Sequence, residues 1–199
     1  MGTVVAIVVG YALTALGLGA TIYYARRAER LNLLRKRLEW ADVQAAATDV
    51  ARRITRDCTP VALITPGLTG ATFANLLVEG LPGQPPVFVG TSTWKDATHG
   101  TVVAGDSFEF ETNKWLVTVP RAPLLYAGGT LLIVDAFVMS GDFLEKLRTR
   151  LVEEGVDPAR IKSASIAVTK VAIKNKKAPD YYWWEAADDD FYFPWGKAR

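Results

Sequence analysis

The sequence that decides the fold reads Leu131-Leu-Ile-Val-Asp-Ala-Phe-Val-Met-Ser-Gly-Asp-Phe143. Four apolar residues predict a buried strand, Asp135 follows them, and a Ser-Gly turn precedes a predicted helix from Phe143 to about Glu154. Ligands of open α/β sheets bind beyond the carboxyl ends of the strands, and the amides at a helix start attract phosphate. The stretch therefore predicts a site for a phosphorylated sugar. The alternative is that Asp135 merely ends a strand and Gly141 only allows a tight turn.

Strands and helices alternate on both sides of this stretch. The expected elements are strands at Pro60–Thr65, Pro86–Gly90 and Thr130–Val134, a helix at Thr72–Glu79, a mobile loop at Lys95–Gly105, a hairpin arm at Phe108–Val119 and a β-branched run at Ile161–Ile173. Such alternation predicts an α/β fold with a mostly parallel sheet flanked by helices, joined by right-handed crossovers.

The amino-terminal segment is expected to anchor the chain in a membrane. Thr3–Tyr24 contains no charged residue, and its 22 residues would span about 33 Å as a helix, enough for a hydrocarbon core of about 30 Å. Arg26, Arg27 and Arg30 follow directly, so the positive-inside rule places the amino terminus outside and the rest of the chain in the cytoplasm. A cleaved signal peptide fits less well, because no basic n-region precedes the span.

The chain is expected to divide into three parts. Residues 1–25 form the transmembrane anchor, residues 26–37 a basic juxtamembrane helix, and residues 38–199 a single domain. The juxtamembrane residues belong to a helix predicted from Ala25 to Asp57. Arg35, Lys36 and Arg37 either contact anionic headgroups or form the solvated flank of that helix.

Composition excludes several classes of function. Half of the residues are apolar and the net charge is only +2, so no dedicated nucleic-acid surface is expected. The single Cys58 excludes an internal disulfide, and with His99 as the only histidine a zinc or iron–sulfur site has too few ligands. A divalent cation held by oxygen ligands remains open.

The central stretch resembles the diphosphoribosyl-binding motif of the type I phosphoribosyltransferases. That motif has four apolar residues, two acids and a Thr-Gly-x-Thr loop that holds the 5-phosphate. Asp135 matches the first acid, Ser140 the first loop hydroxyl and Gly141 the glycine. The resemblance implies that the turn from Ser140 through Asp142 to Phe143 binds the phosphate.

Three positions depart from the motif. Ala136 replaces the second acid, Met139 stands where purine-using members often carry an aspartate, and Phe143 replaces the second loop threonine. Asp135 alone must then orient the ribose hydroxyls or hold Mg²⁺. Met139 cannot act as a base, and the loss of that base would slow turnover without necessarily abolishing binding.

Other segments extend the resemblance from Leu38 to the chain end, toward the hypoxanthine and xanthine–guanine branch. Leu38-Glu-Trp-Ala-Asp-Val43 looks like the first family helix, and Pro179-Asp-Tyr-Tyr182 with Phe191-Tyr-Phe-Pro-Trp195 look like the carboxyl-terminal hood. The implied contacts are Thr65, Pro66 and Gly67 for the pyrophosphate, Thr93 and Trp94 on a mobile lid, Lys170 for the purine 6-oxo group, and Phe191 and Tyr192 for stacking on the base. The alternative for the aromatic residues is packing of the chain terminus.

These observations predict a membrane-anchored, cytoplasm-facing protein of the purine phosphoribosyltransferase type that forms a homodimer. As an enzyme it would use 5-phosphoribosyl diphosphate, a purine base and Mg²⁺. The alternative is a catalytically weak sensor that binds phosphoribosyl diphosphate or a nucleotide at the lipid bilayer. A third possibility is an assembly protein that reuses the fold.

Overall fold

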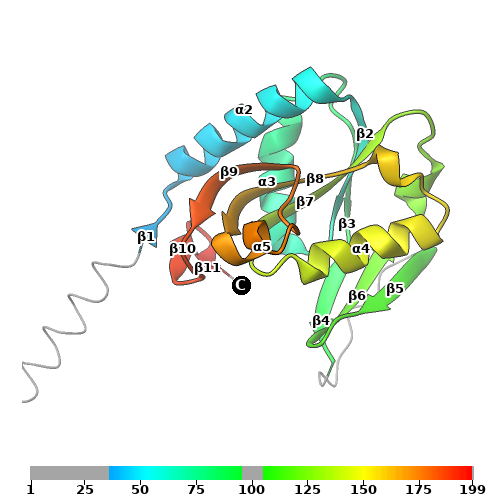
Figure 1. Cartoon of the computed structure of the whole chain (residues 1–199). Helices are drawn as coiled ribbons and strands as arrows, with labels where there is room; N and C mark the ends of the chain where they lie inside the picture. Colours follow the sequence, from blue (N-terminus) through cyan, green and yellow to red (C-terminus); the bar gives the residue numbers. More distant parts are fainter. Residues whose placement is uncertain (1–35, 96–104, 199) are drawn as a thin grey trace, which may run out of the picture.

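A parallel sheet forms the centre of the structure, a computed structural model that describes residues 36–95 and 105–198. The strand order is β3-β2-β7-β8-β9 (Figure 1). In that order, the five strands are Val87–Val89, Pro60–Thr65, Thr130–Val138, Ile161–Thr169 and Tyr181–Ala186. The predicted α/β fold with a mostly parallel sheet is therefore confirmed for the described residues.

Helices and a second sheet cover the two faces of the central sheet. The helices α2 and α3 pack on one face with Leu132 and Val134 of β7. On the other face, α4 and the strands β5 and β6 of the antiparallel sheet β4-β6-β5 pack with Leu131 and Ile133. These elements are α2 (Trp40–Asp57), α3 (Leu68–Glu79), α4 (Asp142–Glu153), β4 (Thr91–Trp94), β5 (Ser107–Glu111) and β6 (Trp115–Pro120). Because neighbouring residues of a strand point to opposite faces, the single apolar run of β7 supplies both cores.

A small sheet with the order β1-β10-β11 lies beside the start of α2. Its strands are Lys36–Arg37, Phe191–Phe193 and Gly196–Lys197. The predicted juxtamembrane helix is wrong at residues 36–37, because these residues pair in parallel with β10, and Leu38 N–H donates to the Tyr192 carbonyl at 2.8 Å. The helix α2 begins only at Trp40, where Glu39 and Asp42 form a capping box.

The expected membrane span and most of the juxtamembrane segment lie outside the described residues. Within the ranges 36–95 and 105–198, no helix combines the length and the apolar composition needed to cross a bilayer. The expected mobile loop at 95–105 also falls largely in residues that the structure does not describe.

Several elements differ from their predicted bounds. Strand β7 continues to Val138 because Phe137 and Val138 pair with β8 and are buried, so Asp135 lies inside the strand and not at its end. Lys170 does not close β8 but begins the short helix α5 (Lys170–Lys174).

Two further elements differ from the sequence prediction. The helix α3 begins four residues before the predicted Thr72, and the 108–119 arm is the two-stranded β5–β6 hairpin. The 3₁₀ turns η1 (Ala122–Leu125) and η2 (Pro158–Arg160) precede β7 and β8.

The carboxyl ends of β2, β7, β8 and β9 share one edge of the sheet, here called the carboxyl edge. The helices α3, α4 and α5 begin there, each directly after its strand. The start of α2 and the strand β1 lie at the same edge, since β1 pairs with β10, which follows the end of β9 (Figure 1). Gly70 allows α3 to lie close against β7, because a Cβ at this position would stand 2.6 Å from the Val134 carbonyl oxygen.

A buried ion cluster joins the antiparallel sheet to α4. The Glu154 carboxylate contacts Arg121 from the segment after β6 and Arg150 from α4, and its side chain is only 8% exposed. The two guanidinium groups also lie 5.8 and 5.6 Å from the Phe108 ring centroid. Removing the carboxylate therefore leaves two arginines beside an aromatic ring with only the exposed Asp106 and Glu153 as counter-charges.

We expect Glu154→Gln to destabilise the protein strongly. Loss of the shared carboxylate is expected to cost about 2 kcal/mol, because the two arginines are partly exposed and keep Asp106 and Glu153, and this lowers Tm by about 4 to 8 °C in a domain of this size. Thermal unfolding of the full chain in detergent measures the change. The matched control is Glu153→Gln, whose side chain is 58% exposed although it also contacts Arg150; its effect is expected to stay below about 0.5 kcal/mol. Equal effects of the two substitutions would contradict the assignment.

Candidate functional site

The turn from β7 into α4 is the centre of the candidate site. Gly141 occupies the N-cap of α4 with a φ of 81°, a left-handed conformation that favours glycine. The Ser140 hydroxyl donates to the Asp142 carboxylate at 2.9 Å. The first-turn amides of a helix have no acceptor within the helix, so those of α4 point toward this corner with the positive end of the helix dipole.

Lys177 closes one side of this turn. A Cβ on Gly141 would overlap the Cβ and the carbonyl oxygen of Lys177, so the two backbones are in close contact. The Lys177 ammonium lies 2.7 Å from the Asp142 carboxylate and 2.6 Å from the Glu145 carboxylate. Its hydrogen bond lowers the pKa of Asp142, and the two carboxylates raise the pKa of Lys177 above its usual range. An approaching phosphate therefore meets two carboxylates and one ammonium group at the helix start.

The end of β8 holds this turn in place. The Thr169 hydroxyl donates to the Met139 carbonyl and accepts hydrogen bonds from the Val171 and Ala172 amides. One buried side chain thus links the β7–α4 turn to α5. Lys170, the residue predicted to contact the purine, is exposed at the start of α5 on the same edge.

Asp135 is half-buried on β7, opposite Ser165 of β8. Burial raises the pKa of its carboxyl to about 7, and hydrogen bonds from the Ala136 and Phe137 amides offset this only in part. The Ala136 amide lies 2.8 Å from the carboxylate. Ala136 itself is packed in the core with α2 and α3. The position of the family's second acid is therefore an apolar core position in this chain.

The β2–α3 turn carries the residues predicted to hold pyrophosphate. Thr65 is fully buried, and its hydroxyl donates to the Gly67 carbonyl at 3.2 Å, so the hydroxyl stabilises the turn. The Ser92 hydroxyl of β4 donates to the Pro66 carbonyl at 2.8 Å and ties the antiparallel sheet to this turn. Ser92 is missed by the sequence reasoning, because three successive hydroxyl residues give no sign of which one faces the turn.

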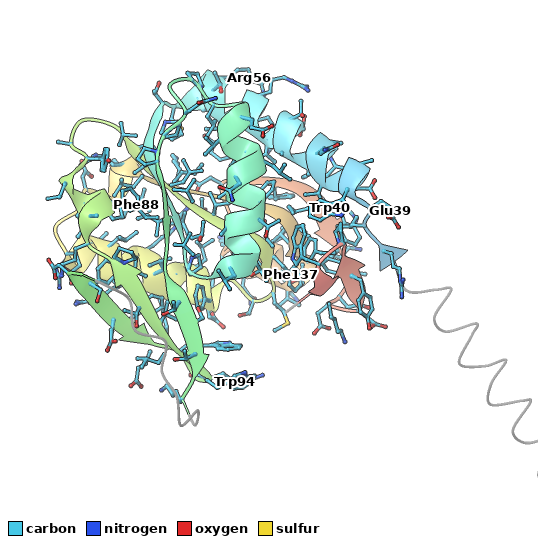
Figure 2. The ribbon with its side chains drawn as sticks, turned by 180° about the vertical axis from the view of Figure 1, so that it is seen from behind. Glu39, Trp40, Arg56, Phe88, Trp94 and Phe137 are labelled. Atoms are coloured by element: carbon cyan, nitrogen blue, oxygen red, sulfur yellow. The ribbon has the colours of Figure 1, made fainter. Side chains whose placement is uncertain are left out.

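The lid residues lie at the tip of the antiparallel sheet. The Thr93 hydroxyl is directed at the Leu116 carbonyl across β4 and β6, 3.5 Å away. Trp94 is exposed at the end of β4 (Figure 2). Its ring packs on that of Trp115, with centroids 4.4 Å apart. The Thr93 hydroxyl is thus directed at a carbonyl within the sheet, whereas the Trp94 ring is accessible to solvent.

The aromatic ending packs against the domain. Phe191 is 1% exposed and contacts the rings of Phe137, Trp184 and Phe193 at centroid distances of 4.9 to 5.2 Å. The prediction that Phe191 stacks on a base is therefore wrong, because its ring is part of the core. The next residue, Tyr192, lies with its ring 5.6 Å from the Arg37 guanidinium.

Metal and cavity geometry place further limits on the site. Among the described residues, no group of three or more His, Cys, Asp or Glu side chains is arranged to hold a metal ion. Asp135 offers one carboxylate, so Mg²⁺ would need oxygens from a bound ligand as well. Two surface grooves lie elsewhere, one between α2 and α3 and one between β5 and α4, and neither is lined by Asp135, Ser140 or Gly141.

The structure brings most of the predicted ligand residues to one edge. The turn Ser140–Phe143, the turn Thr65–Gly67 and Lys170 all follow the carboxyl ends of adjacent strands. A parallel sheet whose helices begin at a shared edge defines an α/β domain of the class that binds its ligands beyond the carboxyl ends of the strands.

The chain matches the family described as phosphoribosyl transferase domain over residues 36–198, and it belongs to this family. Its fold is similar to that of a purine phosphoribosyltransferase from Pyrococcus horikoshii, with 22% identity and a TM-score of 0.60 over 82% of this chain and 94% of the other. The xanthine-guanine-hypoxanthine phosphoribosyltransferase of Helicobacter pylori gives 19% identity and a TM-score of 0.59 over 81% and 94%. A hypothetical protein from Neisseria gonorrhoeae with bound ppGpp gives 19% and 0.57 over 81% and 89%. No curated protein sequence matched the chain.

The raised pKa of Asp135 predicts an unusual dependence of stability on pH. The folded protein keeps this proton up to about pH 7, whereas the unfolded chain loses it near the ordinary value of 3.8. The folded state therefore binds more protons between these values, and the free energy of unfolding falls as the pH rises from about 4 to about 7. Asp135→Asn removes this titration and is expected to raise stability at pH 8 by about 2 kcal/mol, a value discounted for partial contact with water.

Chemical denaturation of the full chain and of Asp135→Asn between pH 4 and 8 tests this expectation. The control Asp106→Asn removes a carboxylate whose side chain is 80% exposed and should keep the original pH profile. Identical profiles for Asp135→Asn and the unsubstituted chain would show that Asp135 ionises normally in the folded state.

Proposed function

We propose that this chain binds 5-phosphoribosyl diphosphate or a purine nucleotide at the carboxyl edge and transfers ribose 5-phosphate to a purine only slowly. One observation carries this proposal: β7 retains Asp135 and the glycine turn into α4, while Ala136 is sealed in the core. Binding elements of the family motif are thus present on a strand that lacks its second acid. The predicted span at Thr3–Tyr24 would hold this domain at the cytoplasmic face of a membrane.

Slow transfer follows from what the side chains can do. Ribosyl transfer depends on orienting the ribose and on balancing the charge of the departing Mg²⁺–pyrophosphate. Asp135 alone can contact ribose hydroxyls or the ion. The Met139 thioether cannot accept a proton from the purine, and a missing general base typically costs about 10² to 10⁴ in rate.

The sensor function is the second candidate, and a separate observation favours it. Asp142 and Glu145 place two carboxylates in the first turn of α4, where the charge of a transferase substrate must be held. These carboxylates repel a phosphate, so a ligand bound here must gain affinity from contacts with further groups of the protein. The protein of similar fold from Neisseria gonorrhoeae was solved with bound ppGpp. In this function, occupancy would be signalled through the predicted span. The homodimer implied by the family resemblance also remains a prediction.

Calorimetry and a product assay on the full chain in detergent distinguish these functions. The ligands are 5-phosphoribosyl diphosphate with Mg²⁺, GMP, ppGpp and the purine bases, and chromatography measures nucleotide formation. Slow turnover with binding supports the leading proposal, whereas binding without product supports the sensor. Absence of binding by every phosphorylated ribose contradicts both. Turnover that survives Asp135→Ala would contradict the assigned site.

We expect Asp142→Asn to tighten the binding of 5-phosphoribosyl diphosphate a few-fold. The substitution removes one negative charge from the start of α4, while Lys177 keeps its contact with Glu145. Titration calorimetry at low ionic strength gives the largest difference, since salt screens exposed charges. The control Glu153→Gln removes the same charge from the opposite end of α4 and should leave affinity unchanged. Weaker binding by Asp142→Asn would place the phosphate elsewhere.

A further inference from the structure

Large apolar side chains are exposed at the carboxyl edge. Trp40, Leu68, Met139 and Val171 are 51%, 80%, 50% and 54% exposed. Trp40 and Leu68 are the first residues of α2 and α3, Met139 follows β7, and Val171 lies in α5. We call these four residues the apolar rim. Single exposed apolar residues are ordinary, but four on the edge that carries the candidate site indicate a contact surface.

The amino-terminal tether reaches the domain at this same edge. The first described residues form β1, which pairs with β10 next to Trp40 and Glu39 at the start of α2 (Figure 2). Eleven residues, at positions 25–35, separate Tyr24 from Lys36, and a chain of that length spans at most about 40 Å. This reach is close to the diameter of the domain itself, about 40 Å. Because the tether joins the domain beside Trp40, this end of the carboxyl edge stays within that reach of the bilayer.

We propose that the apolar rim docks onto the surface of the lipid bilayer in which the chain is anchored. This inference rests on the membrane span of the proposed function. Tethering keeps the rim at a local concentration on the order of millimolar relative to the bilayer, so a contact too weak for a free domain becomes populated. Trp40 suits the interface because its ring combines an apolar body with a polar N–H group.

The charges of this edge indicate what kind of lipid contact forms. Lys170, Lys174 and Lys176 are exposed around Val171 and can extend toward lipid phosphates. The acidic turn Asp188–Asp190 is exposed at the same edge, between β9 and β10. Because the two sets of charges offset each other, docking depends on the apolar side chains and forms on zwitterionic as well as anionic lipids.

Docking also affects the candidate site. Leu68 directly follows Gly67 of the β2–α3 turn, and Met139 directly precedes Ser140 of the β7–α4 turn. A bilayer that contacts the rim therefore covers the entrance to both turns. Ligand binding and bilayer contact then use the same surface, which couples the membrane to the occupancy of the site.

Site-specific fluorescence on the full chain in nanodiscs tests the proposal. In a Cys58→Ser background, Leu68→Cys and Val171→Cys each introduce one thiol for an NBD label. The control Leu125→Cys places the label in η1, before the amino end of β7, at a residue that is 84% exposed. Nitroxide-labelled phosphatidylcholine in the nanodisc quenches only labels that contact lipid.

Docking predicts a blue-shifted emission and strong quenching for the labels at 68 and 171, with neither change at 125. Quenching should be the same when phosphatidylserine is added, and quenching that requires phosphatidylserine would overturn the apolar mechanism. Co-elution of the chain with nanodiscs reports on the span itself. Co-elution without quenching at 68 and 171 overturns the docking alone, whereas failure to co-elute overturns the anchor and the inference together.

Discussion

The candidate site depends on the close contact between Gly141 and the Lys177 backbone. A glycine is required there because the position combines a left-handed φ with a neighbour that would overlap any Cβ. The contact brings the Lys177 ammonium between Asp142 and Glu145, and Thr169 anchors the same turn through the Met139 carbonyl. The start of α4 is thus rigidly held, with its charge set by three side chains that converge from two segments.

Packing and chemistry make opposite demands on the end of β7. Pairing with β8 and burial of Phe137 and Val138 extend the strand past Asp135, which stabilises the sheet. The same burial raises the pKa of the Asp135 carboxyl and makes the neighbouring position 136 part of the core. An acid at position 136 would lie inside that core, where the ionised form of its carboxyl group carries a large desolvation cost. The slow turnover proposed above rests on this packing of the strand.

Sequence reasoning was most successful where local pattern and tertiary environment agree. The strand Pro60–Thr65 has the bounds expected of it, because a short apolar run between turn residues is typical of a buried strand. The early end expected for β7 was wrong because the pairing with β8 keeps the strand extended after the acid. Phe191 was misassigned because an aromatic residue in a hood-like segment has the same sequence signature whether it stacks on a ligand or on Phe137 and Trp184.

The sequence by itself determined the alternation of strands and helices, the family of the fold and the placement of the phosphate-type turn after an apolar strand. These features depend on local periodicity and on glycine, which act within a few residues of each other. Only the tertiary structure decided that β1 pairs with β10, that Ser92 reaches the β2–α3 turn and that Lys177 covers Gly141. Each of these contacts joins segments far apart in the chain, and their geometry follows from how the sheet and its helices pack.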